Sequence, residues 1–304
     1  MEMKKVLILM ATYNGTNYIR EQLDSLLNQS YSNIEILIRD DASKDNTIEI
    51  LREYAERDSR VTFYQGENLG SASCFFDLMK HAPASDYYAF CDQDDVWETD
   101  KIKAAVTLLE ENAYDGPLLY TSNLKIVDQN LTYMVDRFTN GFKTDNKYYC
   151  LTEYRAVGCT MVFNSQALEL VKTHVPTDYM MHDAWMFMTC MIFGRVIYDD
   201  NAYILYRQHS NNVIGYKSNP FVRAKNHFKR LFDRSLQPRL AYAKDFLLVY
   251  GDLLQEEDRQ KLERIVNYKK SFGGRMKLLF DRKICASSWG RDFRYRFLIV
   301  WGII

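Results

Sequence analysis

Three aspartates that follow an apolar stretch are the residues of this sequence best suited to chemistry. Tyr87–Cys91 is apolar and aromatic, as in a buried strand, and Asp92, Asp94 and Asp95 come soon after it. Carboxylates are costly to bury unless they are paired, hydrogen-bonded or bound to a cation. The pattern therefore predicts a strand that ends at a cleft and presents Asp92 and Asp94 to Mg²⁺ or Mn²⁺. A solvated acidic turn before a helix at residues 100–111 is the alternative, and the three aspartates alone do not separate the two.

The chain around these aspartates alternates between apolar runs and segments with helical spacing. We expect strands at residues 6–11, 34–38, 61–65 and 87–91, with helices at 18–28, 48–57 and 68–81. This alternation is typical of an α/β fold with a mostly parallel sheet and helices on both faces. Polar clusters follow three of the strands, at Thr12–Asn14, Asp40–Asp41 and Asp92–Asp94. Because ligands bind at the carboxyl ends of such strands, the three clusters together favour a binding site.

Two common phosphate-binding patterns do not occur in the sequence. A dinucleotide-binding domain would carry G-x-G-x-x-G after the first strand, where Gly15 stands alone. No Walker sequence G-x-x-x-x-G-K-[ST] is present either. A divalent metal on Asp94 would instead provide the contact to phosphate.

Three motifs, in this order and spacing, resemble family 2 glycosyltransferases of the GT-A fold. They are Ala-Thr-Tyr-Asn-Gly at 11–15, Arg-Asp-Asp-Ala-Ser-Lys-Asp-Asn-Thr at 39–47 and Asp-Gln-Asp-Asp-Val-Trp at 92–97, within a resemblance that covers about residues 4–215. The resemblance implies a nucleotide-sugar donor, with Asp41 on the base, Asp92 facing the ribose and Asp94 on a Mn²⁺ or Mg²⁺ ion. The donor contacts that it implies are Ala11, Tyr13, Asp41, Asp92, Gln93 and Arg207.

The resemblance also implies where the acceptor and the general base lie. Asp183 begins an apolar helix at the position where the family carries its base, and a helix N-cap is the alternative. His182 stands where the family usually has an acidic residue, a departure that several rhamnosyltransferase-like members share. Residues 156–164 match a segment that borders the acceptor, and a tight strand turn with a buried cysteine is the alternative. The acceptor contacts expected from these segments are Gly158, Cys159, His182 and Trp185.

A third segment, Tyr-Arg-Gln-His-Ser-Asn-Asn at residues 206–212, resembles the closing motif of bacterial rhamnosyltransferases of cell-wall and capsule assembly. The neighbours of His209 indicate a diphosphate-binding segment, in which His209 contacts the metal or a phosphate and Arg207 is a charge partner. The expected reaction is an inverting transfer of L-rhamnose from dTDP-L-rhamnose to a hydroxyl of a lipid-linked or polysaccharide acceptor. Another UDP- or dTDP-hexose donor, a nucleotidyltransferase and a non-catalytic binding protein are the alternatives.

The charge of the chain changes sign along its length. Residues 1–216 hold 19 Lys+Arg and 31 Asp+Glu, whereas residues 217–304 hold 20 and 9. We expect a GT-A domain at 1–216, followed by a basic, amphipathic helical region at 217–304. That region would contact an anionic membrane surface or form a homodimer face. Nothing in it resembles a nucleic-acid-binding module.

The cysteines and the apolar runs indicate the compartment. Six cysteines are scattered without zinc-binding spacing, as expected in a reducing environment. The N-terminus does not have the pattern of a signal peptide, and no apolar run is long enough to span a bilayer. We therefore expect a cytoplasmic protein that associates peripherally with the cytoplasmic face of the cell membrane.

Overall fold

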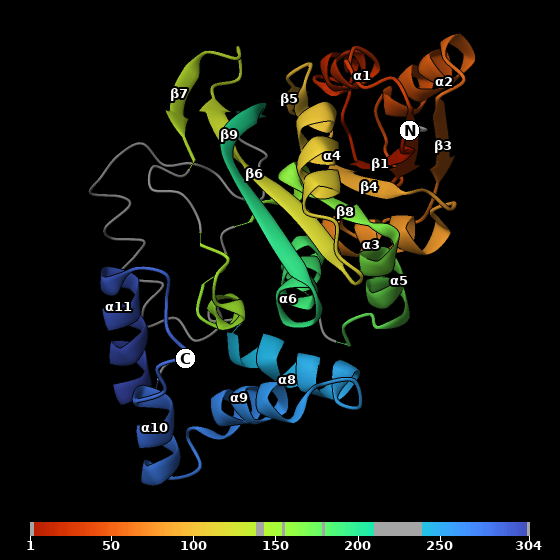
Figure 1. Ribbon diagram of the computed structural model, residues 1–304. Coiled ribbons are helices and arrows are strands. Elements are labelled where there is room, and N and C mark those ends of the chain that lie inside the picture. The colour runs from red at the N-terminus through yellow and green to blue at the C-terminus, as the bar shows by residue number, and fades with distance from the viewer. Residues whose placement is uncertain (1–2, 138–142, 154–155, 178–179, 210–238, 303–304) are drawn as a thin grey trace. The chain divides into compact units, whose positions relative to one another are not determined.

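The structure of the protein is a computed structural model (Figure 1). The chain folds into two compact units. The structure describes residues 3–137, 143–153, 156–177, 180–209 and 239–302. Unit 1 comprises residues 1–142, 156–173 and 181–213, and unit 2 comprises residues 143–155, 174–180 and 214–304. The domain boundary expected after residue 216 lies outside the described residues, as do Asn211, Asn212 and the basic and aromatic positions 221–232.

The described residues of unit 1 form one sheet with strand order β3-β2-β1-β4-β8-β6-β9-β5, and β7 pairs with β6. The strands are β1 (Val6–Thr12), β2 (Ile34–Asp40), β3 (Val61–Gln65), β4 (Tyr87–Cys91), β5 (Val96–Trp97), β6 (Leu118–Val127), β7 (Tyr133–Asp136), β8 (Val162–Asn164) and β9 (Arg195–Arg207). The helices are α1 (Ile19–Leu27), α2 (Thr47–Arg57), α3 (Ser71–His81), α4 (Lys101–Glu111), η2 (Gly158–Thr160), α5 (Ser165–Thr173) and α6 (His182–Phe193).

Strands β1 to β4 form the parallel part of the sheet that the alternating pattern predicted. β1 lies between β2 and β4, and Met10 pairs with both Ile38 and Cys91. All five residues of β4 are buried, and since successive strand residues point to opposite faces, both faces are covered. This register brings the turns after β1, β2 and β4 to the same edge of the sheet, as expected.

The second half of the sheet is mixed, which the sequence did not indicate. β8 runs antiparallel to both β4 and β6, and β5 runs antiparallel to β9, whereas β6 and β9 are parallel. β8 has only three residues and leads directly into α5. A strand of three residues is too short to show a hydrophobic pattern, so the sequence does not indicate how it pairs with its neighbours. β5 and α5 were not predicted.

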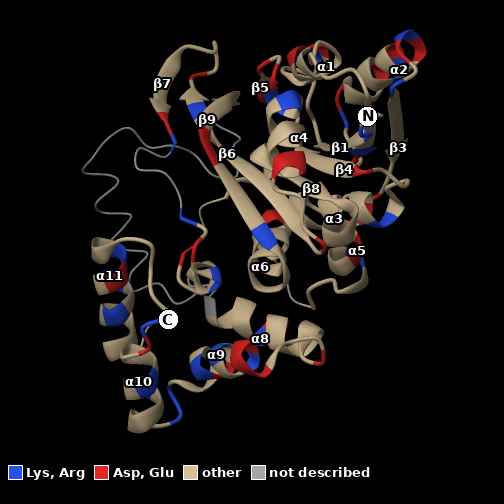
Figure 2. Ribbon diagram, in the orientation of Figure 1, with Lys and Arg blue, Asp and Glu red and all other residues tan. Residues whose placement is uncertain are grey.

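Unit 2 is helical in its described part, as expected for the C-terminal region. It contains η1 (Lys147–Leu151), α8 (Arg239–Tyr250), α9 (Glu256–Asn267), α10 (Phe272–Leu279) and α11 (Trp289–Val300). Lys261 of α9 forms a buried ion pair with Asp281, at 2.7 Å, and Arg264 contacts the same carboxylate. Asp281 precedes the link to α11, so this pair fixes the end of α10 against α9. Lys and Arg outnumber Asp and Glu along α10 and α11 (Figure 2).

The close approach of β9 to β6 depends on Gly194. A Cβ on Gly194 would lie 1.8 Å from the carbonyl oxygen of Pro117, which accepts a hydrogen bond from the Arg195 N–H at 2.9 Å. We expect Gly194→Ala to destabilise the protein by about 1–3 kcal/mol, because backbone must move to admit the methyl group. The melting temperature measured by circular dichroism should fall accordingly, by roughly 2–10 °C.

Gly273→Ala is the matched control for that substitution. A Cβ on Gly273, within α10, would meet no atom within 4 Å. Alanine is the better helix former, so this variant should keep or slightly raise the melting temperature. Equal melting temperatures for the two variants would contradict the assigned packing at Gly194.

Candidate active site

Gln93 joins the turn after β1 to the loop after β4. Its side-chain oxygen accepts the Tyr13 N–H at 2.8 Å, and its Nε2 donates to the Tyr13 carbonyl at 3.0 Å. A Cβ on Gly15 would lie 2.5 Å from the Gln93 oxygen, which explains the glycine in this turn. Gln93 therefore holds the backbone beside Ala11 in place, and it leaves the Tyr13 ring exposed.

Asp40 holds the turn after β2. The Asp40 carboxylate accepts hydrogen bonds from the Ser43 N–H at 2.8 Å and the Thr12 hydroxyl at 3.1 Å. Asn14 completes the link, because its N–H donates to Ser43 Oγ and its side-chain oxygen accepts the Lys44 N–H, both at 2.8 Å. The turns after β1 and β2 thus form one hydrogen-bonded unit.

Asp41 is buried beside an arginine. Its carboxylate contacts the guanidinium of Arg39, and it accepts the N–H groups of Leu69 and Gly70, both at 2.9 Å. Arg39 is itself buried and also pairs with Asp77 at 2.8 Å. A carboxylate offers about four acceptor positions, so Asp41, with three in use, keeps capacity for a further donor. Arg39, to which the sequence assigned no role, fixes the orientation of Asp41.

Asp94 and His209, the two residues predicted to hold a metal, lie together. Their side chains are 2.7 Å apart, between Asp94 Oδ2 and His209 Nε2. The imidazole stacks on the Tyr18 ring with a centroid distance of 4.9 Å. Tyr18, just before α1, was not predicted as a site residue. A carboxylate oxygen and an imidazole nitrogen are a plausible pair of ligands for Mn²⁺.

Arg207 holds the loop after β4 that carries Asp94 and Asp95. Its Nε donates to the Asp94 carbonyl at 2.9 Å, and its backbone N–H donates to the Asp95 carboxylate at 3.1 Å. The guanidinium also pairs with Glu21 and stacks over Tyr18 at 4.7 Å. Arg207 is 2% exposed and positions the backbone of Asp94. The donor contact expected of Arg207 stays a prediction.

Asp92 connects the metal-ligand pair to the predicted base. Burial raises the pKa of Asp92 to about 7, with further contributions from the Asp94 and Asp183 carboxylates. Asp183 is the second residue of α6, where its Oδ2 accepts the Gly158 N–H at 3.2 Å and its Oδ1 accepts the Ala184 N–H at 2.7 Å. Two backbone amides thus orient Asp183, which lies close enough to Asp92 to raise the pKa of that carboxyl.

The predicted acceptor residues fall into two groups. Gly158 is in contact with the base, because a Cβ on it would lie 3.1 Å from His182 Nε2 and 3.2 Å from Asp183 Cβ. His182 stacks on Phe75 at 3.8 Å, and burial lowers the pKa of this histidine to about 4. Cys159 and Trp185 are buried, and the acceptor contacts expected of them stay a prediction. Their side chains pack in the core of unit 1.

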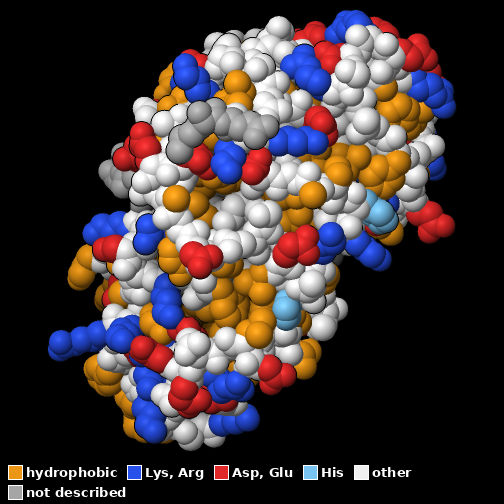
Figure 3. Space-filling model, turned by 45° about the vertical axis from the view of Figure 1, so that its right-hand side comes forward, with side chains coloured by type: hydrophobic (Ala, Val, Ile, Leu, Met, Phe, Trp, Pro, Cys, Tyr) orange, Lys and Arg blue, Asp and Glu red, His pale blue; other side chains and the backbone are white. Residues whose placement is uncertain are grey.

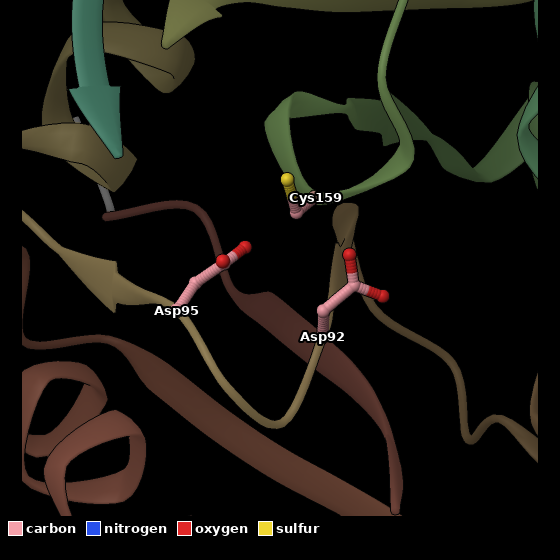
Figure 4. Close-up of side chains that lie close together, drawn as sticks. All are labelled: Asp92, Asp95 and Cys159. Carbon is pink, nitrogen blue, oxygen red and sulfur yellow. The ribbon is translucent and has the colours of Figure 1, made fainter. Parts of the chain in front are cut away.

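Asp92, Asp95 and Cys159 form a second cluster (Figure 4). Both aspartates project from the loop after β4 toward Cys159 on η2, and one potential ligand atom from each residue lies within 4.8 Å of the others. Burial and the two carboxylates raise the pKa of the Cys159 thiol well above its usual value. A protonated thiol is a poor ligand for Mn²⁺ or Mg²⁺, so Asp94 and His209 remain the better metal site.

Comparisons with known proteins identify the family of this chain. A family model described as Glycosyl transferase family 2 matches residues 7–171. The chain belongs to this family. It is 32% identical over 235 residues to "dTDP-rhamnosyl transferase RfbG" of Shigella flexneri, an alignment that covers 73% of this chain and 78% of RfbG. An uncharacterized glycosyltransferase of Rickettsia typhi, RT0329, is 27% identical over 67% of this chain and 64% of its own length.

Solved structures show the same fold. TarS of S. aureus, crystallised with UDP-GlcNAc, superposes with a TM-score of 0.58 at 17% identity and covers 99% of this chain and 82% of its own. The mannosyltransferase PcManGT of Pyrobaculum calidifontis, in complex with GDP-Man and Mn²⁺, gives 0.52 at 16% identity, covering 99% and 88%. The predicted GT-A fold is confirmed, and this family member is a glycosyltransferase.

Lys101 is a buried lysine near Asp95 and Cys159. Its side chain, at the start of α4, is fully buried, with Nζ 3.4 Å from the centre of the Trp97 ring. Within the described part of the chain Nζ has no hydrogen-bond partner. Burial lowers the pKa of Lys101 from 10.5 to about 7, although the nearby Cys91, Cys159 and Asp95 oppose the shift. A buried ammonium without a hydrogen bond destabilises the folded state.

We expect Lys101→Met to stabilise the protein in a pH-dependent way. The folded pKa lies below the unfolded one, so protonation of Lys101 disfavours folding at low pH, and this penalty vanishes as pH rises toward 10.5. The melting temperature of the variant should exceed that of the wild type by about 5 °C or more near pH 6. A difference that grows with pH would contradict this assignment.

Proposed function

We propose that this glycosyltransferase is an inverting, metal-dependent rhamnosyltransferase. The observation that carries the proposal is the 2.7 Å contact between Asp94 and His209, residues 115 positions apart that we expected as metal ligands. RfbG, a dTDP-rhamnosyl transferase by name, supports L-rhamnose as the sugar and dTDP as its carrier. Another UDP- or dTDP-hexose is the alternative donor.

The nucleotide would lie at the carboxyl ends of β1, β2 and β4. Asp41 has room for one more hydrogen-bond donor and would accept the N3–H of thymine or uracil. The exposed Tyr13 ring would stack on the base, next to the backbone at Ala11. Asp92 would face the ribose, and Gln93 keeps the two turns at the spacing that this binding needs.

Asp94 and His209 would hold Mn²⁺ or Mg²⁺ against the diphosphate. When bound, the ion supplies a positive charge that stabilises the departing diphosphate. The chain's own contribution is to fix the two ligands, because Arg207 anchors the Asp94 backbone and Tyr18 stacks on His209. Neither ligand can then turn away when the donor arrives.

Asp183 would act as the general base. Two backbone N–H groups orient its carboxylate, and the neutral His182 beside it adds no competing charge. Asp183 would take the proton from an acceptor hydroxyl as that oxygen attacks the anomeric carbon opposite the diphosphate. Gly158 has no side chain, which lets its N–H approach this carboxylate closely. A lipid-linked glycan at the cytoplasmic face of the cell membrane is the acceptor that we propose.

Asp183→Asn should lower turnover by about 10²–10⁴-fold and leave donor affinity unchanged, because the amide keeps the shape but cannot take a proton. Turnover is measured as dTDP release with an acceptor present, and affinity by titration calorimetry with dTDP-L-rhamnose. Asp200→Asn, the same substitution at an exposed position of β9, is the control and should behave as the wild type. Near-normal turnover in Asp183→Asn would remove this residue from the mechanism.

A panel of dTDP- and UDP-sugars, titrated with and without Mn²⁺, tests the donor and the metal. We expect dTDP-L-rhamnose to bind most tightly, and only when Mn²⁺ is present. Asp94→Ala should lower donor affinity by at least about tenfold, because His209, the one remaining protein ligand, would hold a divalent ion weakly. Equal binding by wild type and Asp94→Ala in the presence of Mn²⁺ would contradict the metal site. If a UDP-hexose binds most tightly instead, the proposed metal site stands and the proposed donor is wrong.

A further inference from the structure

The helices α10 and α11 of unit 2 expose an unusual number of large apolar side chains. Phe272, Phe280, Trp289, Phe293 and Trp301 are each between 62% and 84% exposed. The two helices pack on each other, and Arg275 of α10 donates to the Val300 carbonyl of α11 at 3.3 Å. Extended exposed apolar patches are rare on monomeric soluble proteins and mark sites of interaction.

The aromatic residues of α11 lie in a regular row. Trp289, Phe293, Phe297 and Trp301 follow one another at intervals of four residues, which places them on one side of the helix. The Trp289 and Phe293 rings stack with centroids 5.9 Å apart, and Phe297 and Trp301 are also 5.9 Å apart. The buried residues Tyr295, Leu298 and Ile299 occupy the other side. α11 therefore has one apolar face inside unit 2 and a second face outside it.

Positive charge surrounds this row. Residues 268–302 contain nine Lys and Arg but only two acidic residues, Asp281 and Asp292. Both aspartates are already paired, Asp281 with Lys261 and Asp292 with Arg296. Lys277 and Arg282 are exposed beside the aromatic residues. Orange and blue side chains are intermixed at the lower left of Figure 3, where α10 and α11 lie.

We infer that this α10–α11 surface, formed by the aromatic residues above with Lys277 and Arg282, binds the surface of an anionic lipid bilayer. Tryptophan and phenylalanine enter the headgroup region, and lysine and arginine are attracted to anionic lipids. A second copy of the chain fits less well, because two faces of this charge would repel each other. No helix in the described part of the chain is long and apolar enough to cross a membrane, so the surface would lie on the bilayer.

This inference goes beyond sugar transfer and does not rest on the proposed donor. It assigns to named side chains the contact by which the enzyme would reach a membrane-bound acceptor. Binding to vesicles can be measured without donor, metal or turnover. Failure of the lipid contact and failure of the rhamnosyltransferase assignment would therefore be seen in different experiments.

Intrinsic tryptophan fluorescence offers a direct test, because two of the four tryptophans are buried and the other two belong to the proposed lipid-binding surface. Trp97 and Trp185 are buried, and Trp289 and Trp301 are exposed on α11. Vesicles of phosphatidylglycerol and phosphatidylcholine should shift the emission to shorter wavelength and shield it from acrylamide. Vesicles of phosphatidylcholine alone should have little effect. Added salt should weaken the binding, since the attraction to anionic lipid is screened.

Paired substitutions separate the two contributions in a vesicle sedimentation assay with the full chain. Lys277→Glu with Arg282→Glu should lower partitioning onto anionic vesicles by about 30-fold or more at low salt. Trp289→Ala with Trp301→Ala should lower it by at least about tenfold. Tyr133→Ala, which removes an exposed aromatic ring from β7 of unit 1, is the control and should leave binding unchanged.

Two results would overturn the inference. One is equal partitioning of the wild type and both double variants onto anionic vesicles. The other is absence of vesicle binding together with a dimer, seen by analytical ultracentrifugation, that dissociates in Trp289→Ala with Trp301→Ala. The second result would make the α10–α11 surface a contact between two copies. Because every substituted residue is exposed, melting temperatures close to that of the wild type should accompany all of these variants.

Discussion

The electrostatic cost of gathering carboxylates in a partly water-excluded space governs this structure. Asp92, Asp94 and Asp95 share one short loop, and Asp183 approaches Asp92 from another segment. Burial, and then repulsion from neighbouring carboxylates, raise the pKa of Asp92 and Asp95, so ionising these two groups costs free energy. Such a cluster persists only where the surrounding structure determines its geometry, and it gains stability when a cation binds.

The supports of the loop come from distant parts of the chain, and each has a distinct physical role. Arg207 brings a positive charge under the loop and holds the Asp94 carbonyl, while Gln93 ties the loop to the turn after β1. Arg39 does the same for Asp41 at the neighbouring strand end. Both arginines are buried and make several hydrogen bonds, which is the condition under which a buried charge is tolerated. The rigid parallel strands then set the distances between these fixed points.

The sequence predicted most of what depends on local pattern. Strand ends with polar clusters located the site, since apolar runs such as Tyr87–Cys91 identify buried strands and the parallel arrangement brings their ends together. Asp94 and His209 were expected as metal ligands from two separate motifs, and only the fold shows that residues so far apart in the chain are in contact. The burial of individual side chains could not be predicted: Trp185 and Arg207 lie in segments that suggest chemistry, and both are buried. The direction of β8 depends on packing between β4 and β6, which leaves no periodic signal in three residues.

The neutral histidine next to Asp183 gives the base its particular environment. His182 lies between Phe75 and Phe90, with ring centroids at 3.8 and 4.8 Å, and this apolar contact explains why its pKa is low. An ionised acidic side chain at the same place would be buried against two phenyl rings and would repel Asp183, at a cost of several kcal/mol. The imidazole avoids both effects and still fills the space beside Gly158. Asp183 is therefore the single carboxylate in the first turn of α6, where it lies close enough to Asp92 to raise the pKa of that carboxyl.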